Sequence, residues 1–138
     1  IHFLYIFQQD LTRAYDSKYV SEALAKVECV VFQGSWDQPT AALADIQLPA
    51  AVYAEKEGTF TNIQGRVKRF QAAVPPIGAS LPDLDILSRL ALELGVSLSG
   101  TNTAAVFGEI AQTVAAFTGM TWQSVGTTGQ LLMPESGK

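Results

Sequence analysis

The chain has 138 residues, of which 48% are hydrophobic, 16% are charged and one is a cysteine, and its formal net charge is −4. A chain of this length forms one domain or a piece of a larger one, and its apolar share is sufficient for a core. The lone Cys29 excludes an internal disulfide framework and cysteine-ligated iron–sulfur or zinc sites within this segment, and the negative charge argues against general nucleic-acid binding. No apolar run approaches the roughly 18 residues of a membrane-spanning helix. Because the sequence begins at Ile1, inside an apolar run, we expect a fragment of a longer protein.

The first 52 residues are expected to form a βαβ-type part. Residues 3–7 (FLYIF) and 29–33 (CVVFQ) have the aromatic and branched composition of buried strands. Between them, Asp16 or Ser17 can cap a helix whose apolar face comprises Tyr19, Val20, Ala23, Leu24 and Val27. A helical connection of this length predicts that the two strands are parallel.

A short helix over residues 38–45 and a third extended segment over residues 46–52 are expected next, with Pro49 at a strand end or a sheet edge. The predicted fold class is therefore α/β, a small and mainly parallel sheet flanked by helices. Residues 53–80 depart from the alternation of strand and helix. Gly58 and Gly65 indicate tight turns there, so we expect an ordered loop excursion that projects at residues 53–70.

Residues 81–132 are expected to form C-terminal helices. Ser80 and Asp83 have the spacing of a capping box at the start of the first helix, and Gly95 is suited to its end. Its predicted apolar stripe comprises Leu84, Leu87, Leu90, Ala91 and Leu94. A second helix is predicted from Asn102 or Thr103 to Gly119, followed by Trp122 and Val125 as apolar anchors.

Three stretches of the sequence resemble the molybdopterin-oxidoreductase superfamily. Residues 48–66, LPAAVYAEKEGTFTNIQGR, resemble the block ADxxLPAAxxxEKEGTFTNxEGRxQ. Residues 74–95 resemble AVPPPGxARPDWEILxxLAxxLG, and residues 107–132 resemble a less defined segment of complex I subunits. The closest resemblance is to the large peripheral iron–sulfur subunit of respiratory NADH:quinone oxidoreductase (complex I). Formate dehydrogenase α-subunits carry a similar block.

This resemblance implies a scaffold domain of the large iron–sulfur subunit of complex I, which supports electron transfer from NADH to quinone and has no activity alone. It implies no cofactor, metal or catalytic residue in residues 1–138, and iron–sulfur clusters elsewhere in the parent. The implied partners are the rest of the parent chain and other peripheral-arm subunits, without nucleic acid or direct membrane insertion. The implied location is cytoplasmic and peripheral to the inner membrane.

The alternative is a fragment of a molybdenum or tungsten enzyme, such as a formate dehydrogenase α-subunit, that helps to bind molybdopterin guanine dinucleotide. By resemblance, the candidate cofactor-binding residues are then Thr61, Asn62 and Arg66. In a complex I subunit the same residues would hold the loop together, Asn62 through the backbone and Arg66 by pairing with Glu55 or Glu57. The family often has a Gly-x-Asn-Pro turn after its first strand, where this chain has Gln8-Gln9-Asp10-Leu11.

A basic strip, formed by Lys56, Arg66, Lys68 and Arg69, stands out in this acidic chain. It fits a solvated hairpin face and equally a site for phosphate or for an acidic partner. A third class of function is therefore a protein-interaction module. His2 is the only histidine, and without Cys or His partners it predicts neither a metal site nor a catalytic triad.

Overall fold

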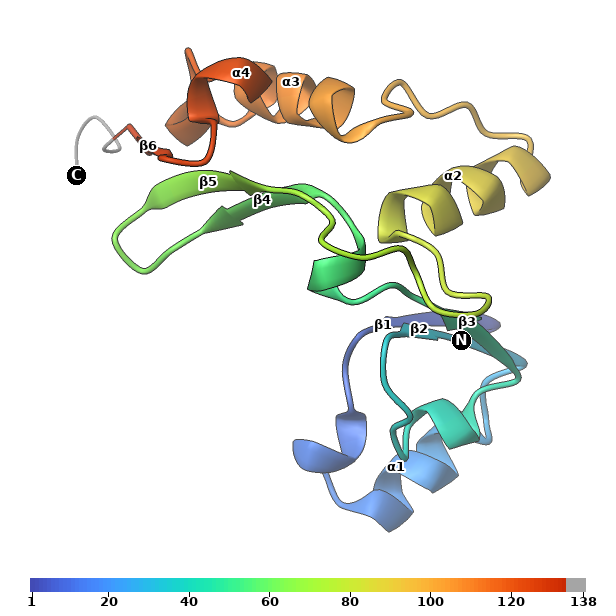
Figure 1. The fold of residues 1–138 in the computed structure, drawn as a ribbon. Helices are drawn as coiled ribbons and strands as arrows, with labels where there is room; N and C mark the ends of the chain where they lie inside the picture. Colours follow the sequence, from blue (N-terminus) through green and yellow to red (C-terminus); the bar gives the residue numbers. More distant parts are fainter. Residues whose placement is uncertain (134–138) are drawn as a thin grey trace. The chain divides into compact units, whose positions relative to one another are not determined.

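The computed structural model describes residues 1–133, and the chain divides into two compact units (Figure 1). Unit 1 comprises Ile1–Val52 and Pro76–Asp83, and unit 2 comprises Tyr53–Pro75 and Leu84–Lys138, of which residues 134–138 lie outside the description. The expected α/β class with a small parallel sheet is confirmed. Within residues 1–133, no helix has the length and apolar character needed to cross a lipid bilayer.

Unit 1 is built on a three-stranded parallel sheet in the order β1-β2-β3. Its elements are β1 (Phe3–Phe7), the 3-10 helix η1 (Leu11–Arg13), α1 (Ser17–Leu24), β2 (Cys29–Gly34), the 3-10 helix η2 (Ala41–Leu43) and β3 (Ile46–Pro49). The two predicted strands, their parallel pairing and the place of Pro49 at a strand end are confirmed. Strand β2 is buried as predicted, but in β1 only Ile6 is buried, and Phe3 and Phe7 are 54% and 49% exposed. The polypeptide therefore brings the carboxyl ends of three strands to one edge of the sheet.

Helix α1 begins at Ser17 because the Asp16 side chain accepts hydrogen bonds from the backbone N–H groups of Lys18 and Tyr19, both at 3.0 Å. The helix buries Val20 and Leu24 in the core of unit 1. Tyr19 was predicted on this face, but it is 64% exposed. The buried residues of α1 form one narrow stripe along the helix, and Tyr19 lies outside this stripe.

Only the single turn of η2, and not a helix over residues 38–45, connects β2 to β3. The backbone is already extended at Ala44 (φ −88°, ψ 144°). The Asp45 N–H donates to the Val30 carbonyl at 2.9 Å, and the Asp45 carboxylate accepts from the Val30 N–H at 2.7 Å. The Asp45 N–H therefore pairs with β2 and is not available for a hydrogen bond within a longer helix.

Residues 76–83 return to the sheet of unit 1. Leu81 N–H donates to the Pro49 carbonyl at 3.1 Å, and Ala51 N–H donates to the Leu81 carbonyl at 2.8 Å. The predicted capping box of Ser80 and Asp83 does not form. The Ser80 hydroxyl donates to the Ile77 carbonyl, and the Asp83 carboxylate accepts from Gln33 Nε2 at 2.7 Å. Helix α2 (Asp83–Glu93) therefore begins at Asp83 rather than at Ser80.

The fully buried Gln33 amide links two elements of unit 1. Its Oε1 accepts a hydrogen bond from the Tyr5 hydroxyl, while its Nε2 donates to Asp83. Burial, and secondarily the charge of Asp83, raise the pKa of Tyr5 above its ordinary value. The phenol is therefore held in its neutral, donating form, as this chain of hydrogen bonds requires.

Unit 2 is built on a three-stranded antiparallel sheet in the order β4-β5-β6. Its elements are the 3-10 helix η3 (Tyr53–Glu55), β4 (Gly58–Thr61), β5 (Arg66–Phe70), all of α2 after Asp83, α3 (Thr103–Thr113), the 3-10 helix η4 (Ala115–Phe117), α4 (Trp122–Val125) and β6 (Gln130–Leu131). The excursion expected at residues 53–70 is largely a β-hairpin, whose Val67 packs with Phe107, Met120 and Val125.

The C-terminal helices differ from expectation in their buried faces and lengths. Helix α2 buries Ile86, whereas Leu87 and Leu94 of the predicted stripe are 40% and 70% exposed. The prediction assumed that one whole face was covered, but only one position of α2 is buried. Helix α3 begins at Thr103, within the expected start, and Asn102 caps it. The helix ends at Thr113 rather than at Gly119, because Val114 adopts an extended conformation.

Candidate functional site

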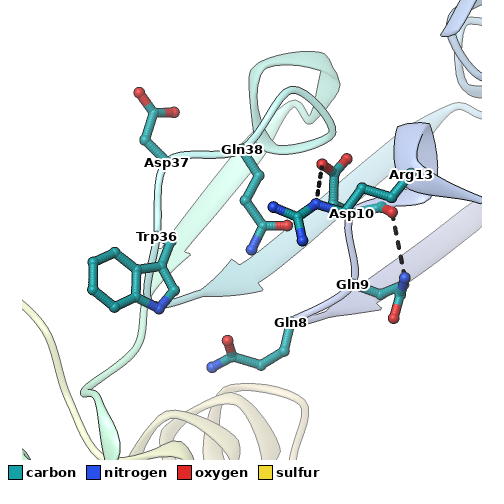
Figure 2. Close-up of a pocket in the computed structure, with 7 residues that line it drawn as sticks. All are labelled: Gln8, Gln9, Asp10, Arg13, Trp36, Asp37 and Gln38. Atoms are coloured by element: carbon teal, nitrogen blue, oxygen red, sulfur yellow. Dashed lines mark hydrogen bonds and ion pairs between the residues drawn. The ribbon is translucent and has the colours of Figure 1, made fainter.

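A polar cavity of about 570 Å³ lies beyond the carboxyl ends of β1 and β2 (Figure 2). Its volume falls in the range of small-molecule sites. In open α/β sheets, ligands bind in the crevice outside the carboxyl ends of the strands. The cavity is lined by two loops, which supply Gln8, Gln9, Asp10, Arg13, Trp36, Asp37 and Gln38.

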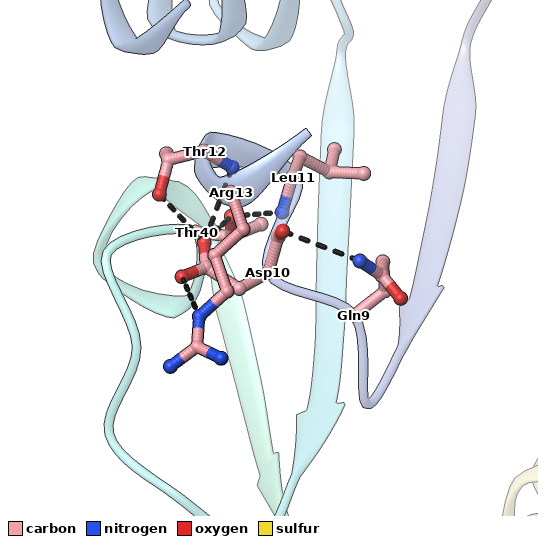
Figure 3. Close-up of polar contacts among 6 residues, drawn as sticks. All are labelled: Gln9, Asp10, Leu11, Thr12, Arg13 and Thr40. Atoms are coloured by element: carbon pink, nitrogen blue, oxygen red, sulfur yellow. Dashed lines mark hydrogen bonds and ion pairs between the residues drawn. The ribbon is translucent and has the colours of Figure 1, made fainter. Parts of the chain in front are cut away.

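The two loops are joined by a contact that we call the Asp10–Thr40 clasp (Figure 3). The fully buried Thr40 hydroxyl donates to Asp10 Oδ1 at 2.8 Å and accepts from the Leu11 N–H at 2.9 Å. Asp10 Oδ1 also accepts from the N–H and the hydroxyl of Thr12, at 3.2 and 2.8 Å. The clasp therefore fixes the loop after β1 against the loop after β2.

These contacts favour the ionised form of Asp10. The hydrogen bond from the Thr12 hydroxyl is the largest cause that lowers the pKa of Asp10; burial opposes it, and Thr40 and Arg13 contribute further lowering. Arg13 Nε lies 3.7 Å from Asp10 Oδ2. Because the folded-state pKa is lowered, the stabilisation is present at neutral pH and is lost as the pH falls through that pKa.

Gln8, which also lines the cavity, has an unusual backbone conformation. It follows β1 directly, and among residues 1–133 it is the one non-glycine residue with a positive φ, +58°. Its N–H donates to the Gln33 carbonyl at 2.8 Å, and its Oε1 accepts from the Ser35 hydroxyl at 3.1 Å. The loop after β1 therefore starts in a left-handed conformation that is held from β2 and from the loop that follows it.

Two further residues that line the cavity, Trp36 and Gln38, bear on what it can bind. Gln38 Oε1 is buried and accepts no hydrogen bond from the residues that the structure describes. Trp36 is 71% exposed, and the neighbouring Asp37, whose carboxylate points away from the Trp36 ring in Figure 2, is exposed as well. A buried acceptor without a donor is costly in a folded protein, so a bound donor is the physical counterpart that Gln38 lacks.

No group of three or more His, Cys, Asp and Glu side chains within residues 1–133 is arranged to hold a metal ion. The groups that line the cavity can offer a ligand hydrogen bonds, charge and an aromatic ring. They include acceptors in Asp37 and Gln38, and donors in Arg13 and the glutamine amides.

The residues predicted from the sequence as cofactor-binding lie in unit 2. Thr61 ends β4, opposite Val67. Asn62 Oδ1 accepts from the N–H groups of Gln64 and Arg66, at 3.0 and 2.9 Å, and so fixes the hairpin turn. Arg66 Nη1 donates to the Gly129 carbonyl at 3.1 Å, and not to Glu55 or Glu57 as the scaffold interpretation expected. Whether Thr61, Asn62 and Arg66 also contact a cofactor stays a prediction.

The basic strip does not form one surface. Side chains alternate along a strand, so Arg66 and Arg69 of β5 lie on opposite faces of the hairpin. Arg69 lies over the ring of Trp122, 5.3 Å from its centre, on the side where Val67 is buried. Arg69 is therefore held by a cation–π contact within unit 2.

Sequence reasoning missed the polar cavity. It treated Gln8–Leu11 only as a departure from a family turn, and it placed Gln38 in a short helix without assigning residues 35–38 to a site. The available signal was the polar run directly after each of two strands already predicted to be parallel, because such runs meet at one edge of a sheet.

We predict that Thr40→Val destabilises unit 1 by about 1–3 kcal/mol, because it leaves the Leu11 N–H unpaired and removes a donor from Asp10. Urea unfolding followed by circular dichroism measures this loss. Thr101→Val, at an exposed position, is the matched control and should stay within about 0.5 kcal/mol of the wild type. Equal effects of the two substitutions would contradict the clasp.

Comparison with known proteins identifies the family. The model of the molybdopterin oxidoreductase family matches residues 1–93. The F420-dependent formate dehydrogenase 2 subunit alpha of Methanococcus maripaludis and the F420-dependent formate dehydrogenase subunit alpha of Methanocaldococcus jannaschii are each 36% identical over 132 residues, 94% of this chain. A putative formate dehydrogenase of Staphylococcus haemolyticus is 33% identical over 136 residues, 97% of this chain.

The chain spans 20% of the length of each of the first two relatives and 14% of the third. These relatives match the formate dehydrogenase alternative and lend no support to the expected complex I subunit. The family match covers more than half of the chain and includes both strands that border the cavity. The chain belongs to the molybdopterin oxidoreductase family.

Proposed function

We propose that the chain is part of a molybdenum or tungsten enzyme of the formate dehydrogenase type, and that unit 1 helps to bind the nucleotide of molybdopterin guanine dinucleotide. The relatives named as formate dehydrogenases support the enzyme class. Since the chain spans a fifth or less of their length, formate oxidation and the metal site belong to the proposal for the whole protein.

The observation that carries the nucleotide assignment is the polar cavity at the carboxyl ends of β1 and β2, with Gln38 Oε1 buried and lacking a donor within the described residues. Guanine carries N–H donors that match carboxylate and amide acceptors. In this proposal Asp37 and Gln38 accept from the base, and the exposed ring of Trp36 stacks on it.

Among the remaining cavity residues, Arg13 suits the charged part of the ligand. Arg13 is 86% exposed at its side chain and supplies donors for a phosphate oxygen. The Asp10–Thr40 clasp keeps the two loops in place before the ligand binds, which lowers the entropic cost of binding. The bound metal would supply the redox chemistry, while this segment would bind and orient the nucleotide.

Cofactors and partners beyond this segment follow from the same proposal. The iron–sulfur clusters would belong to other parts of a parent protein, because one cysteine cannot ligate a cluster alone. The partner of this segment would be the remainder of that polypeptide. The runner-up, a scaffold in complex I without a pterin, is distinguished by metal content.

Protein purified from its natural source should contain stoichiometric molybdenum or tungsten together with a guanine-nucleotide pterin. Elemental analysis and chromatography of the acid-released cofactor measure both. Iron without molybdenum, tungsten or pterin would contradict the proposal and would favour the complex I scaffold.

Asn62→Ala and Arg66→Ala should lower the stability of unit 2 and leave cofactor content unchanged, because their hydrogen bonds lie within that unit. We expect a loss of about 0.5–1 kcal/mol for each, given the partial exposure of these contacts. Thermal unfolding and cofactor analysis are measured together, with Gln64→Ala as the control in the same turn. A fall in cofactor content with unchanged stability would instead assign these residues to cofactor binding.

A further inference from the structure

Gln8 adopts a backbone conformation that glycine adopts without strain. Its φ of +58° places a side chain with a Cβ in the left-handed region, which costs free energy for an L-residue. Strained residues of this kind persist where the surrounding structure holds them, and they concentrate at functional sites. Gln8 lines the polar cavity, so the strain lies within the candidate site itself.

The contacts of Gln8 orient its amide. The N–H of Gln8 extends the pairing of β1 with β2 by donating to the Gln33 carbonyl. The Ser35 hydroxyl donates to Gln8 Oε1 at 3.1 Å, so the oxygen end of the amide is already engaged. The Nε2 end makes no hydrogen bond to the residues described, and it remains a donor at the wall of the cavity (Figure 2).

We propose that Gln8 is a ligand-binding residue of the cavity, and that its Nε2 donates to a phosphate oxygen of the bound nucleotide. The proposal rests on the nucleotide-binding role of unit 1. Arg13, on the same loop, is the cation that lines the cavity; its Nε lies 3.7 Å from Asp10 Oδ2, and the carboxylates of Asp10 and Asp37 line the cavity as well. Neutral amide donors such as Gln8 Nε2 therefore supplement a single cation in contacting the several acceptor oxygens of a phosphate.

A purely structural role for Gln8 has a different consequence. Glycine adopts the left-handed conformation without a Cβ clash, so a structural requirement at position 8 is met by glycine at least as well. The side chain of Gln8 does one thing that glycine cannot do, because its Oε1 accepts from the Ser35 hydroxyl, and the binding experiment separates this structural contact from a contact with a ligand.

The test compares Gln8→Gly with Gln8→Ala in the 138-residue chain. Both lose the amide, but only glycine relieves the strained backbone. The melting temperature of Gln8→Gly should therefore exceed that of Gln8→Ala by about 3 °C. The same pair at Gln71, an exposed glutamine without a positive φ, is the control and should show the reverse order.

Binding is measured by calorimetric titration with GDP and with guanosine. Both variants at position 8 should bind GDP about 5- to 10-fold more weakly than the wild type, as the loss of one hydrogen bond predicts. Guanosine, which lacks phosphate, should bind the wild type and the variants equally. Both variants at position 71 should bind GDP as the wild type does.

The outcomes separate this proposal from the proposed function. If the wild type binds GDP and both position-8 variants bind it equally well, the role of Gln8 is overturned and the nucleotide site stands. An equal loss of guanosine affinity overturns the phosphate contact. If Gln8→Gly melts below Gln8→Ala, the backbone strain is overturned. If the wild type does not bind GDP, both the nucleotide site and the role of Gln8 fail.

Discussion

The hydrogen bonds of the buried Thr40 hydroxyl determine the shape of the candidate site. A parallel sheet pairs its strands along their length but leaves the loops at their carboxyl ends without ladder partners. In unit 1 the loop after β1 is held because Thr40 accepts from Leu11 N–H and donates to Asp10, 2.9 and 2.8 Å away. This contact and the hydrogen bond of Ser35 to Gln8 hold the two loops whose side chains line the cavity. The clasp thus connects the parallel topology to a preorganised site.

The two units use their polar side chains differently. In unit 2, Asn62 and Arg66 bond to backbone groups of the hairpin and of the segment beside it. In unit 1, Gln38 Oε1 is buried without a donor among the described residues, and Gln8 retains a left-handed backbone. Unit 2 also contains buried polar atoms without a hydrogen-bond partner among the described residues, Arg69 Nε and Ser88 Oγ, so it is the left-handed backbone of Gln8 beside the cavity that sets unit 1 apart.

The sequence was sufficient to predict the α/β class, β1, β2 and a helix cap at Asp16 or Ser17, because strand composition and capping are local properties. It was insufficient for the length of the link before β3 and for the buried face of α2, which depend on tertiary partners. The motif at residues 48–66 indicated the family, yet it directed attention to the hairpin. The cavity remained unseen, because Asp10 and Thr40 are thirty residues apart and meet only through the parallel topology.

The most direct test of nucleotide binding by unit 1 is an NMR titration of the ¹⁵N-labelled chain with GDP. We expect the amide resonances of residues 8–13, 35–38 and 40 to shift with one common affinity, while those of the hairpin at residues 58–70 do not shift. Shifts confined to the hairpin, or no saturable shifts at residues 8–13, 35–38 and 40, would contradict the claim that the edge of the parallel sheet binds the nucleotide.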